Sequence, residues 1–278
     1  MALSKTKKKV RRRVNKKNQK IIFDKYELYR KAVQSAEQDV VFIRNTFKDL
    51  KGREPKTMRE DFCGTFALST EWVKLDAKHQ AIGVDLDPEP MAYGREHYLS
   101  KLKPEQAKRI QLIEGNVLDS HLPKADIVLA MNFSYFCFKK REMMKSYFAN
   151  VFKTLNKDGM FLIDIFGGSQ CYDAIEDVIK HDGFTYFWDQ TNFDPVTNEA
   201  LFHIHFKVKG QKIERVFTYD WRLWNISELR EILEEVGFKK THVYWEGTAK
   251  DGSGDGNFHR TEQGESCLSW IAYIVAEK

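Results

Sequence analysis

The stretch that decides the fold reads Arg59-Glu60-Asp61-Phe62-Cys63-Gly64-Thr65. It lies where a short strand, expected over residues 57–62, passes into a helix expected over residues 65–75. Twenty-one residues after Gly64, Asp85 ends the apolar run that predicts a second strand over residues 80–86. A strand, a glycine turn, a helix and a second strand that ends in an acid form the unit in which a carboxylate binds ribose hydroxyls.

Strands and helices continue to alternate after this unit. Pro88 begins a helix expected to extend to residue 101, and Gly159 follows another helix expected over residues 141–155. Apolar runs predict strands at residues 110–117, 125–133 and 160–166. This alternation predicts an α/β fold with a doubly wound, mostly parallel, seven-stranded sheet that binds its ligand at the carboxyl ends of the strands.

After Gly168 the pattern changes to short strands joined by turns. Strands expected at residues 184–190, 200–208 and 212–221 predict an antiparallel lid or insertion over residues 184–221. Residues 21–278 are expected to form one domain that includes this insertion. The remaining expected elements are helices at 24–50, 171–180 and 227–236, the last capped by Ser227, final strands at 241–245 and 267–276, and a mobile loop at 247–264.

Two classes of ligand use a turn of this kind, and the charges beside it distinguish them. The pyrophosphate of a dinucleotide is bound by bare glycine backbone at a helix N-terminus. Here Glu60 and Asp61 precede the turn, and only Gly64 remains of three possible glycines. Two carboxylates would repel a pyrophosphate but attract a cationic ligand, so the sequence favours the sulfonium cofactor S-adenosylmethionine over NAD.

At these residues the chain resembles the class I S-adenosylmethionine-dependent methyltransferases, over residues 57–245. The first motif of that family is an acid, a spacer and Gly-x-Gly-x-Gly, and here Glu60 is the acid while Phe62, Gly64 and Phe66 stand at the three glycine positions. The resemblance implies a Rossmann-like methyltransferase fold with S-adenosylmethionine as cofactor. Residues 86–90 and 132–138 resemble an uncharacterised bacterial subgroup of methyltransferase domains.

Later positions match the family more closely. Asp85 stands at the ribose-binding acid, and Leu86 stands where a side chain packs on the adenine. Asn116 replaces an acid that accepts a hydrogen bond from the adenine amino group. Asn132 and Tyr135 follow the fourth strand, where the family meets cofactor and substrate, and are the expected catalytic residues. The implied cofactor-binding residues are Arg59, Glu60, Cys63, Gly64, Thr65, Asp85, Leu86, Asn116, Val117 and Asn132.

Several other side chains have two interpretations. Cys63 is a nucleophile or a small residue in a tight turn, and the second is favoured because no histidine is near it in the sequence. His203 and His205 share a strand face; a lid or interface face is favoured over a metal site because no third ligand is evident. Tyr26 and Tyr29 either contact the cofactor from an N-terminal helix or pack in the interior. We expect no metal site.

The net charge of +5 comes from one end of the chain. Residues 1–20 hold ten Lys or Arg and no acid, and the remainder has 35 basic against 40 acidic residues. This segment is expected to be a disordered tail that could attract nucleic acid. No run approaches the ~20 apolar residues that span a bilayer. We therefore expect no membrane association. The four scattered cysteines form no CxxC, so we expect a reducing cytoplasm.

Methyl transfer from a sulfonium is an in-line displacement, in which the protein aligns the reactants and excludes water. The aromatic strands of residues 184–221 favour a small-molecule acceptor held in an enclosed pocket. Two alternatives stay open: an RNA or protein methyltransferase recruited by the basic tail, and a non-catalytic binding protein on the same fold. The sequence predicts neither the acceptor nor the oligomeric state.

Overall fold

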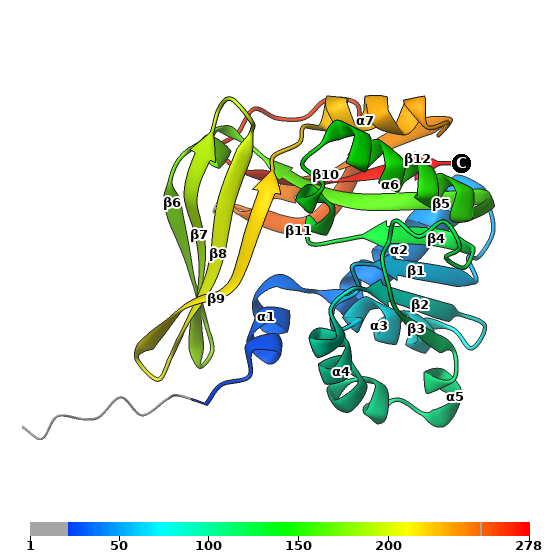
Figure 1. The fold of residues 1–278 in the computed structure, drawn as a ribbon, viewed down its shortest axis with the longest axis horizontal. Coiled ribbons are helices and arrows are strands. Elements are labelled where there is room, and N and C mark those ends of the chain that lie inside the picture. The colour runs from blue at the N-terminus through cyan, green and yellow to red at the C-terminus, as the bar shows by residue number, and fades with distance from the viewer. Residues whose placement is uncertain (1–21, 251) are drawn as a thin grey trace, which may run out of the picture.

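The computed structural model describes residues 22–250 and 252–278, which contain two β-sheets (Figure 1). The larger sheet has eight strands in the order β11-β10-β12-β5-β4-β1-β2-β3, and the smaller has four in the order β6-β7-β8-β9. The strands are β1 (Thr57–Asp61), β2 (Gln80–Asp85), β3 (Ile110–Glu114), β4 (Ala125–Ala130), β5 (Leu155–Gly167), β6 (Ile175–His181), β7 (Phe184–Asp194), β8 (Glu199–Val208), β9 (Gln211–Arg222), β10 (Lys240–Thr248), β11 (Gly254–Thr261) and β12 (Trp270–Glu277).

Strands β1 to β5 pair in parallel, and β12, β10 and β11 extend the sheet through antiparallel pairs. This arrangement confirms the predicted doubly wound, mostly parallel α/β fold. The predicted number of seven strands is wrong, because residues 254–261 form an eighth strand. That segment was expected to be part of a mobile loop, but Val243 of β10 lies in register with Thr261 and Glu246 with Phe258.

Helices cover both faces of the larger sheet, because strand side chains alternate between two apolar faces. Phe47 of α2 and Trp72 of α3 pack on one face, and Phe148 of α6 and Ile232 of α7 pack on the other. The helices are α1 (Lys25–Val33), α2 (Ala36–Lys51), α3 (Ala67–Leu75), α4 (Pro88–His97), α5 (Pro104–Ala107), α6 (Arg141–Thr154) and α7 (Ile226–Glu235), with 3₁₀ turns η1 (Leu99–Lys101), η2 (Ser134–Cys137) and η3 (Ser169–Tyr172).

The helix predicted over residues 24–50 is two helices, because the backbone of Gln34 is extended between α1 and α2. Asp24 caps α1 by accepting hydrogen bonds from the backbone N–H groups of Tyr26 and Glu27. In Figure 1, α1 lies between α4 and β9. Ring contacts connect it to both, since Tyr26 lies 4.8 Å from Tyr93 and Tyr29 lies 5.1 Å from Phe217, measured between ring centroids.

The smaller sheet begins earlier than the insertion predicted over residues 184–221. Residues 171–180 were expected to be helical, but after η3 they form β6, which pairs with β7 from Ile175 opposite Gln190 to His181 opposite Phe184. Gly183 adopts a φ of +81° in the turn between the two strands. The cap of α7 also differs from the prediction: Asn225, rather than Ser227, accepts the hydrogen bond from the N–H of Glu228, at 2.8 Å.

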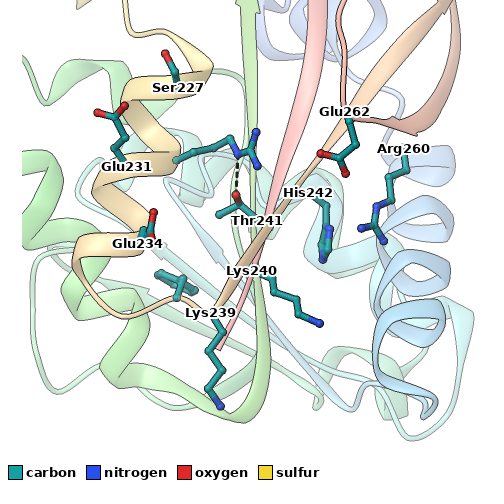
Figure 2. A pocket seen from close by; sticks show the side chains of 11 residues that line it. Ser227, Glu231, Glu234, Lys239, Lys240, Thr241, His242, Arg260 and Glu262 are labelled. Atoms are coloured by element: carbon teal, nitrogen blue, oxygen red, sulfur yellow. Dashed lines mark hydrogen bonds between the residues drawn. The ribbon is translucent and has the colours of Figure 1, made fainter.

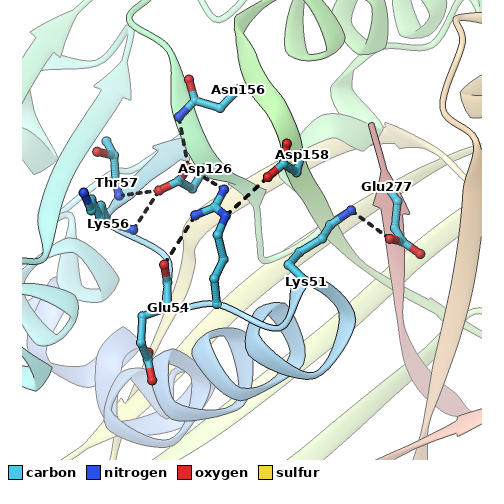
Figure 3. Close-up of polar contacts among 9 residues, drawn as sticks. Lys51, Glu54, Lys56, Thr57, Asp126, Asn156, Asp158 and Glu277 are labelled. Atoms are coloured by element: carbon cyan, nitrogen blue, oxygen red, sulfur yellow. Dashed lines mark hydrogen bonds and ion pairs between the residues drawn. The ribbon is translucent and has the colours of Figure 1, made fainter.

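A cluster of polar contacts closes the amino end of the larger sheet (Figure 3). Asp126, at the start of β4, accepts hydrogen bonds from Lys56 N at 2.7 Å, Arg53 Nη2 at 3.0 Å and Asn156 Nδ2 at 3.0 Å. Although burial acts in the opposite direction, these donors hold the pKa of Asp126 below its usual value. The carboxylate is therefore satisfied within the protein, as expected of a structural group.

Two sequence predictions concern the surroundings of the domain. The basic tail of residues 1–20 lies outside the described residues. No helix within residues 22–250 and 252–278 has both the length and the apolar character that a bilayer span requires.

Candidate functional site

The turn after β1 keeps the backbone path of a glycine motif although two of its glycines are missing. Phe62, Gly64 and Phe66 have φ values of +58°, +50° and +48°, so all three lie in the left-handed region. For the two phenylalanines this conformation costs roughly 1 kcal/mol or more each. All three motif positions therefore lie in the backbone region that favours glycine.

A glycine in α4, Gly94, lies directly against the Phe66 ring. The Phe66 side chain is fully buried and packs with Cys63 and Met91. A Cβ atom on Gly94 of α4 would collide with the carbonyl oxygen of Thr65 and lie 2.5 Å from Cε1 of Phe66. The absence of a side chain at Gly94 thus permits the bulky ring in the turn and lets α4 approach it closely.

Asp85 holds this turn from the end of β2. Its Oδ2 accepts a hydrogen bond from Gly64 N at 2.7 Å, and its Oδ1 accepts one from Asp87 N at 2.8 Å. The residue is only partly buried. Since a carboxylate oxygen can accept two hydrogen bonds, each oxygen of Asp85 keeps a free acceptor position for a ligand.

A cleft of about 250 Å³ opens over this turn, and we call it the turn cleft. The predicted residues that it brings together are Cys63, Gly64, Thr65, Asp85 and Asn132. Its other walls come from distant parts of the chain and include Tyr26 and Tyr29 of α1 and Phe217 and Tyr219 of β9. The cleft therefore lies at the carboxyl ends of β1, β2 and β4, as the fold predicts.

Arg59 and Glu60, although predicted as cofactor-binding, do not line the turn cleft. Arg59 is fully buried and forms an ion pair with Asp61, with Nε to Oδ1 at 2.8 Å. The Tyr147 hydroxyl donates a further hydrogen bond to Asp61 at 3.0 Å. These groups lie beneath the turn because alternate side chains of β1 enter the packed layers on either side of the sheet.

Glu60 faces the layer opposite Arg59. Its Oε2 accepts hydrogen bonds from Ser69 N at 3.0 Å and Ser69 Oγ at 2.7 Å, near the start of α3. Burial raises the pKa of Glu60 to about 8, although the two hydrogen bonds from Ser69 act in the other direction. This carboxyl group anchors α3 to β1, and it does not add a charge to the lining of the cleft.

Leu86, Asn116 and Val117 lie beside the cleft without lining it. Gly115 N donates a hydrogen bond to the carbonyl oxygen of Asp85 at 2.8 Å, so the loop after β3 runs next to Asp85. Leu86 is 66% exposed and Val117 is buried in the core. The Oδ1 of Asn116 accepts a hydrogen bond from Leu118 N at 2.9 Å, so its carbonyl serves the loop itself.

A second left-handed turn follows β4. Asn132 and Phe133 have φ values of +57° and +56°. Asp164 of β5 accepts hydrogen bonds from both of their backbone N–H groups, at 2.6 and 2.9 Å. The Asp164 side chain is buried, and burial raises its pKa to about 7 despite these two donors. The only sequence signal for this role is one acid within the apolar run of β5.

Tyr135, predicted as catalytic, is part of the support for the second turn. It is fully buried, and its hydroxyl donates a hydrogen bond to the carbonyl oxygen of Asp164 at 2.7 Å. The side chain cannot reach a ligand because η2 turns it into the layer between the sheet and α6, where its ring lies 6.5 Å from that of Phe148. Of the two predicted catalytic residues, only Asn132 lines the cleft.

Two further cavities meet the turn cleft at Asn132. One, of about 380 Å³, lies under the smaller sheet and has Phe166, Tyr186, Trp188 and Trp221 in its walls; we call it the aromatic cavity. The other, of about 270 Å³, lies over β5 and β12. Asn132 lines all three spaces, and Phe133 lines both of the cavities. The second turn is thus the common wall of a three-part site.

His203 and His205 do not line any part of this site. His205 Nδ1 accepts a hydrogen bond from Arg215 N at 2.7 Å, which places the ring proton on Nε2, 3.1 Å from Asp189. Glu176 lies nearby and completes a group with metal-ligand composition. However, a protonated Nε2 cannot ligate a metal, and Glu176 is already paired with Lys212. The arrangement agrees with a structural face of the smaller sheet.

A separate cavity of about 550 Å³ lies between α7 and β10 (Figure 2). Its walls carry mixed charges, including Arg230, Glu234, Lys240 and Glu262. Arg230 donates a hydrogen bond to the hydroxyl of Thr241 at 2.7 Å. None of the predicted site residues lines this cavity, and its intermixed charges specify no ligand.

Comparisons with known proteins agree with this architecture. No family model matches the chain. The ribosomal protein L11 methyltransferase of Clostridium botulinum is 35% identical over 100 residues, which cover 36% of this chain and 28% of that protein. The chain therefore spans little more than a quarter of the length of the curated relatives that it matches.

The likeness to solved structures extends over most of the chain. An S-adenosylmethionine-dependent methyltransferase from Clostridium acetobutylicum has a TM-score of 0.67 at 15% identity and covers 91% of this chain and 96% of its own. CalS10, an amino pentose methyltransferase from Micromonospora echinaspora, has a TM-score of 0.65 at 13% identity, with coverages of 93% and 98%. The sugar N-methyltransferase KedS8 from Streptoalloteichus has a TM-score of 0.61 at 14% identity, with coverages of 100% and 98%. At these identities the likeness is one of fold.

Proposed function

Because the chain has the fold of the class I S-adenosylmethionine-dependent methyltransferases, we propose that it binds S-adenosylmethionine in the turn cleft and methylates a small-molecule acceptor. The observation that carries this proposal is the first turn. Its three motif positions are left-handed, and Asp85 at the tip of the next strand holds the N–H of Gly64. The turn and Asp85 line the same cleft, as a nucleoside ligand requires.

The lining of the turn cleft suits a cation that carries no phosphate. Asp85 and Asp87 contribute carboxylates, and none of the described residues that line the cleft is Lys, Arg or His. A pyrophosphate would be repelled by these carboxylates, whereas a sulfonium or an ammonium would be attracted. Tyr26, Tyr29 and Tyr219 add aromatic rings, which also attract cations. The cleft thus fits S-adenosylmethionine better than a dinucleotide.

We assign the ribose hydroxyls of the cofactor to the free acceptor positions of Asp85, and the rest of its adenosyl group to the backbone of Cys63, Gly64 and Thr65. The bound cofactor would supply an electrophilic methyl group on a good leaving group. The protein would align the acceptor at Asn132 and exclude water, with α1 and β9 closing the cleft from above.

The aromatic cavity supports a small-molecule acceptor. It is walled by the smaller sheet and the ends of β4 and β5, so a ligand there would be enclosed and next to Asn132. The names of the similar proteins include acceptors of several kinds, among them an amino pentose and a ribosomal protein. Those acceptors belong to those proteins, whereas the proposal for this chain depends on its own cavity.

Calorimetry of S-adenosylmethionine binding tests the proposal. Asp85→Ala is expected to weaken binding by about 100-fold or more, since two charge-assisted hydrogen bonds contribute about 3 kcal/mol or more together. Asp85→Asn keeps an acceptor for Gly64 N and separates the loss of the turn from the loss of ligand contacts. Asp119→Ala, a surface acid outside the cleft, is the control. Retention of wild-type affinity by Asp85→Ala would refute the assignment.

Two other functions predict different results. A nucleic-acid methyltransferase would show salt-dependent RNA binding that disappears when residues 1–20 are deleted. A non-catalytic binding protein would bind the cofactor without transferring labelled methyl groups to any acceptor in metabolite pools or total RNA. Binding of NAD in place of S-adenosylmethionine would contradict all three.

A further inference from the structure

The cavity over β5 and β12 has a composition that the proposed cofactor does not explain. We call it the acidic cavity, and its walls contain three carboxyl groups, those of Asp39, Asp164 and Glu246. They come from α2, β5 and β10, which are distant in sequence. No described residue that lines the cavity is Lys, Arg or His. The chain therefore collects negative charge in a confined space without a matching positive charge.

Each of these carboxyl groups is partly or fully buried, and none forms an ion pair with a described residue. Burial raises the pKa of Asp39 to about 6 and the pKa of Asp164 to about 7, and it raises the pKa of Glu246 as well. Ionised groups in such surroundings destabilise the folded protein unless a proton or a cation neutralises them. Asp126, with its arginine, amide and backbone donors, shows how this same chain satisfies a structural carboxylate.

The lining of the acidic cavity also contains aromatic side chains. Phe42, Phe258 and Tyr273 form one cluster, in which the ring centroids of Phe42 and Tyr273 are 5.1 Å apart and those of Phe258 and Tyr273 are 4.2 Å apart. Aromatic rings attract an organic cation through their negative faces. Carboxylates and rings in one cavity are a combination suited to an alkylammonium group, and rings give a small hydrated metal ion no ligands.

The acidic cavity adjoins the turn cleft, where we propose that the cofactor binds. It shares Asn132 with the turn cleft and shares Asn132 and Phe133 with the aromatic cavity. A ligand with an ammonium group in the acidic cavity could therefore place its apolar part in the aromatic cavity. Such a ligand would pass in front of Asn132, where the methyl group is expected.

We infer that the methyl acceptor carries an ammonium group that is bound by Asp39 and Glu246, and an apolar body that occupies the aromatic cavity. The ammonium has no lone pair and is the binding group; another atom of the acceptor, in front of Asn132, takes the methyl group as the sulfonium bond breaks. This inference rests on the proposed function and specifies its substrate class. Asp39 and Glu246 are the specificity-determining residues, because Asp164 is already engaged by the second turn. A neutral analogue would leave the carboxylates without a cationic partner and would bind more weakly.

A matched pair of probes tests this inference. Phenethylamine and 2-phenylethanol have similar shapes and differ in the charged group. Their binding to the full chain saturated with S-adenosylhomocysteine is measured by ligand-observed NMR titration. The wild type is expected to bind the amine at least about tenfold more tightly than the alcohol. The reason is that pairing the ammonium of the amine with a carboxylate of the cavity contributes about 1.4 kcal/mol or more.

The variants locate the preference. The double variant Asp39→Asn/Glu246→Gln is expected to lose the preference for the amine while its affinity for S-adenosylmethionine stays within about twofold of the wild type. Asp119→Asn, which removes a surface charge of the same kind, should change neither property. Circular dichroism and thermal unfolding confirm that each variant is folded.

Each other outcome has a defined meaning. Equal binding of the two probes, no binding of the amine, or a preference that survives in the double variant overturns the inference. If the double variant instead loses affinity for S-adenosylmethionine, the carboxylates serve the ammonium of the cofactor, and the inference fails while the proposed function stands. If the wild type binds neither S-adenosylmethionine nor S-adenosylhomocysteine, the proposed function fails first.

Discussion

The turn after β1 and the turn after β4 both hold non-glycine residues in the left-handed region, and an aspartate of the neighbouring strand supports each turn. Asp85 accepts the N–H of Gly64, and Asp164 accepts the N–H groups of Asn132 and Phe133. The two aspartates differ in their surroundings. Asp85 is partly exposed and keeps acceptor positions on the turn cleft, whereas Asp164 is buried and holds two N–H groups of one turn. The same residue type can therefore serve a ligand at one strand end and the fold at the next.

The sharpest test of this difference is the removal of each carboxyl group. Asp164→Ala is expected to lower the free energy of unfolding by about 3 kcal/mol or more, because it removes a buried carboxyl group and leaves two part-buried N–H groups without their acceptor. Asp85→Ala is expected to lower it by only about 1 kcal/mol, because Asp85 is partly exposed and water can replace it, most readily at the exposed N–H of Asp87. Urea unfolding followed by tryptophan fluorescence measures both. Equal losses would remove the distinction between the two turns.

The support of the first turn by α4 gives the next largest effect. Gly94→Ala places a methyl group against the Thr65 carbonyl and the Phe66 ring, and it is expected to destabilise the protein by about 2 kcal/mol. Gly115→Ala is the matched control, since the nearest atom to its added Cβ would be 3.4 Å away. Thermal unfolding of the two variants should separate clearly. A harmless Gly94→Ala would mean that α4 does not constrain the turn.

The smallest expected effect is a pH dependence at the second turn. The pKa of Asp164 in the folded protein, about 7, lies above its ordinary value of 3.8, so the folded chain binds more protons between these values. The stabilisation from this group is complete below pH 3.8 and is lost as the pH rises through 7. Asp164→Asn cannot titrate, so its deficit in unfolding free energy should shrink by about 1 kcal/mol or more between pH 5 and pH 8. A deficit that is constant with pH would contradict the assignment.

The first turn could be predicted because its chemistry depends on local spacing. Gly64 and Asp85 follow two consecutive strands, and parallel strands bring their carboxyl ends together. The second turn was predicted only in part. Asn132 follows the apolar run of β4, but Asp164 comes thirty-two residues later within β5, and nothing local relates the two residues.

Arg59, Glu60 and Tyr135 lie outside the lining of the turn cleft for a related reason. Sequence identifies residues near the end of a strand, but alternation sends successive side chains to opposite layers, and both layers here are covered by helices. Arg59 forms an ion pair with Asp61, Glu60 accepts a hydrogen bond from Ser69, and Tyr135 donates one to the backbone of Asp164. These partners exist only after the helices have packed on the sheet.

Local sequence alone determined the alternation of strands and helices, the glycine turn and the acid at the tip of β2, because these depend on short-range periodicity and on single residue types. Tertiary structure decided the rest. The strands β6 and β11 form because β7 and β10 offer partners for their backbone groups, and the acidic cavity exists because α2, β5 and β10 converge. Strand pairing and the clustering of carboxyl groups both depend on contacts between residues far apart in the chain, which a short stretch of sequence does not contain.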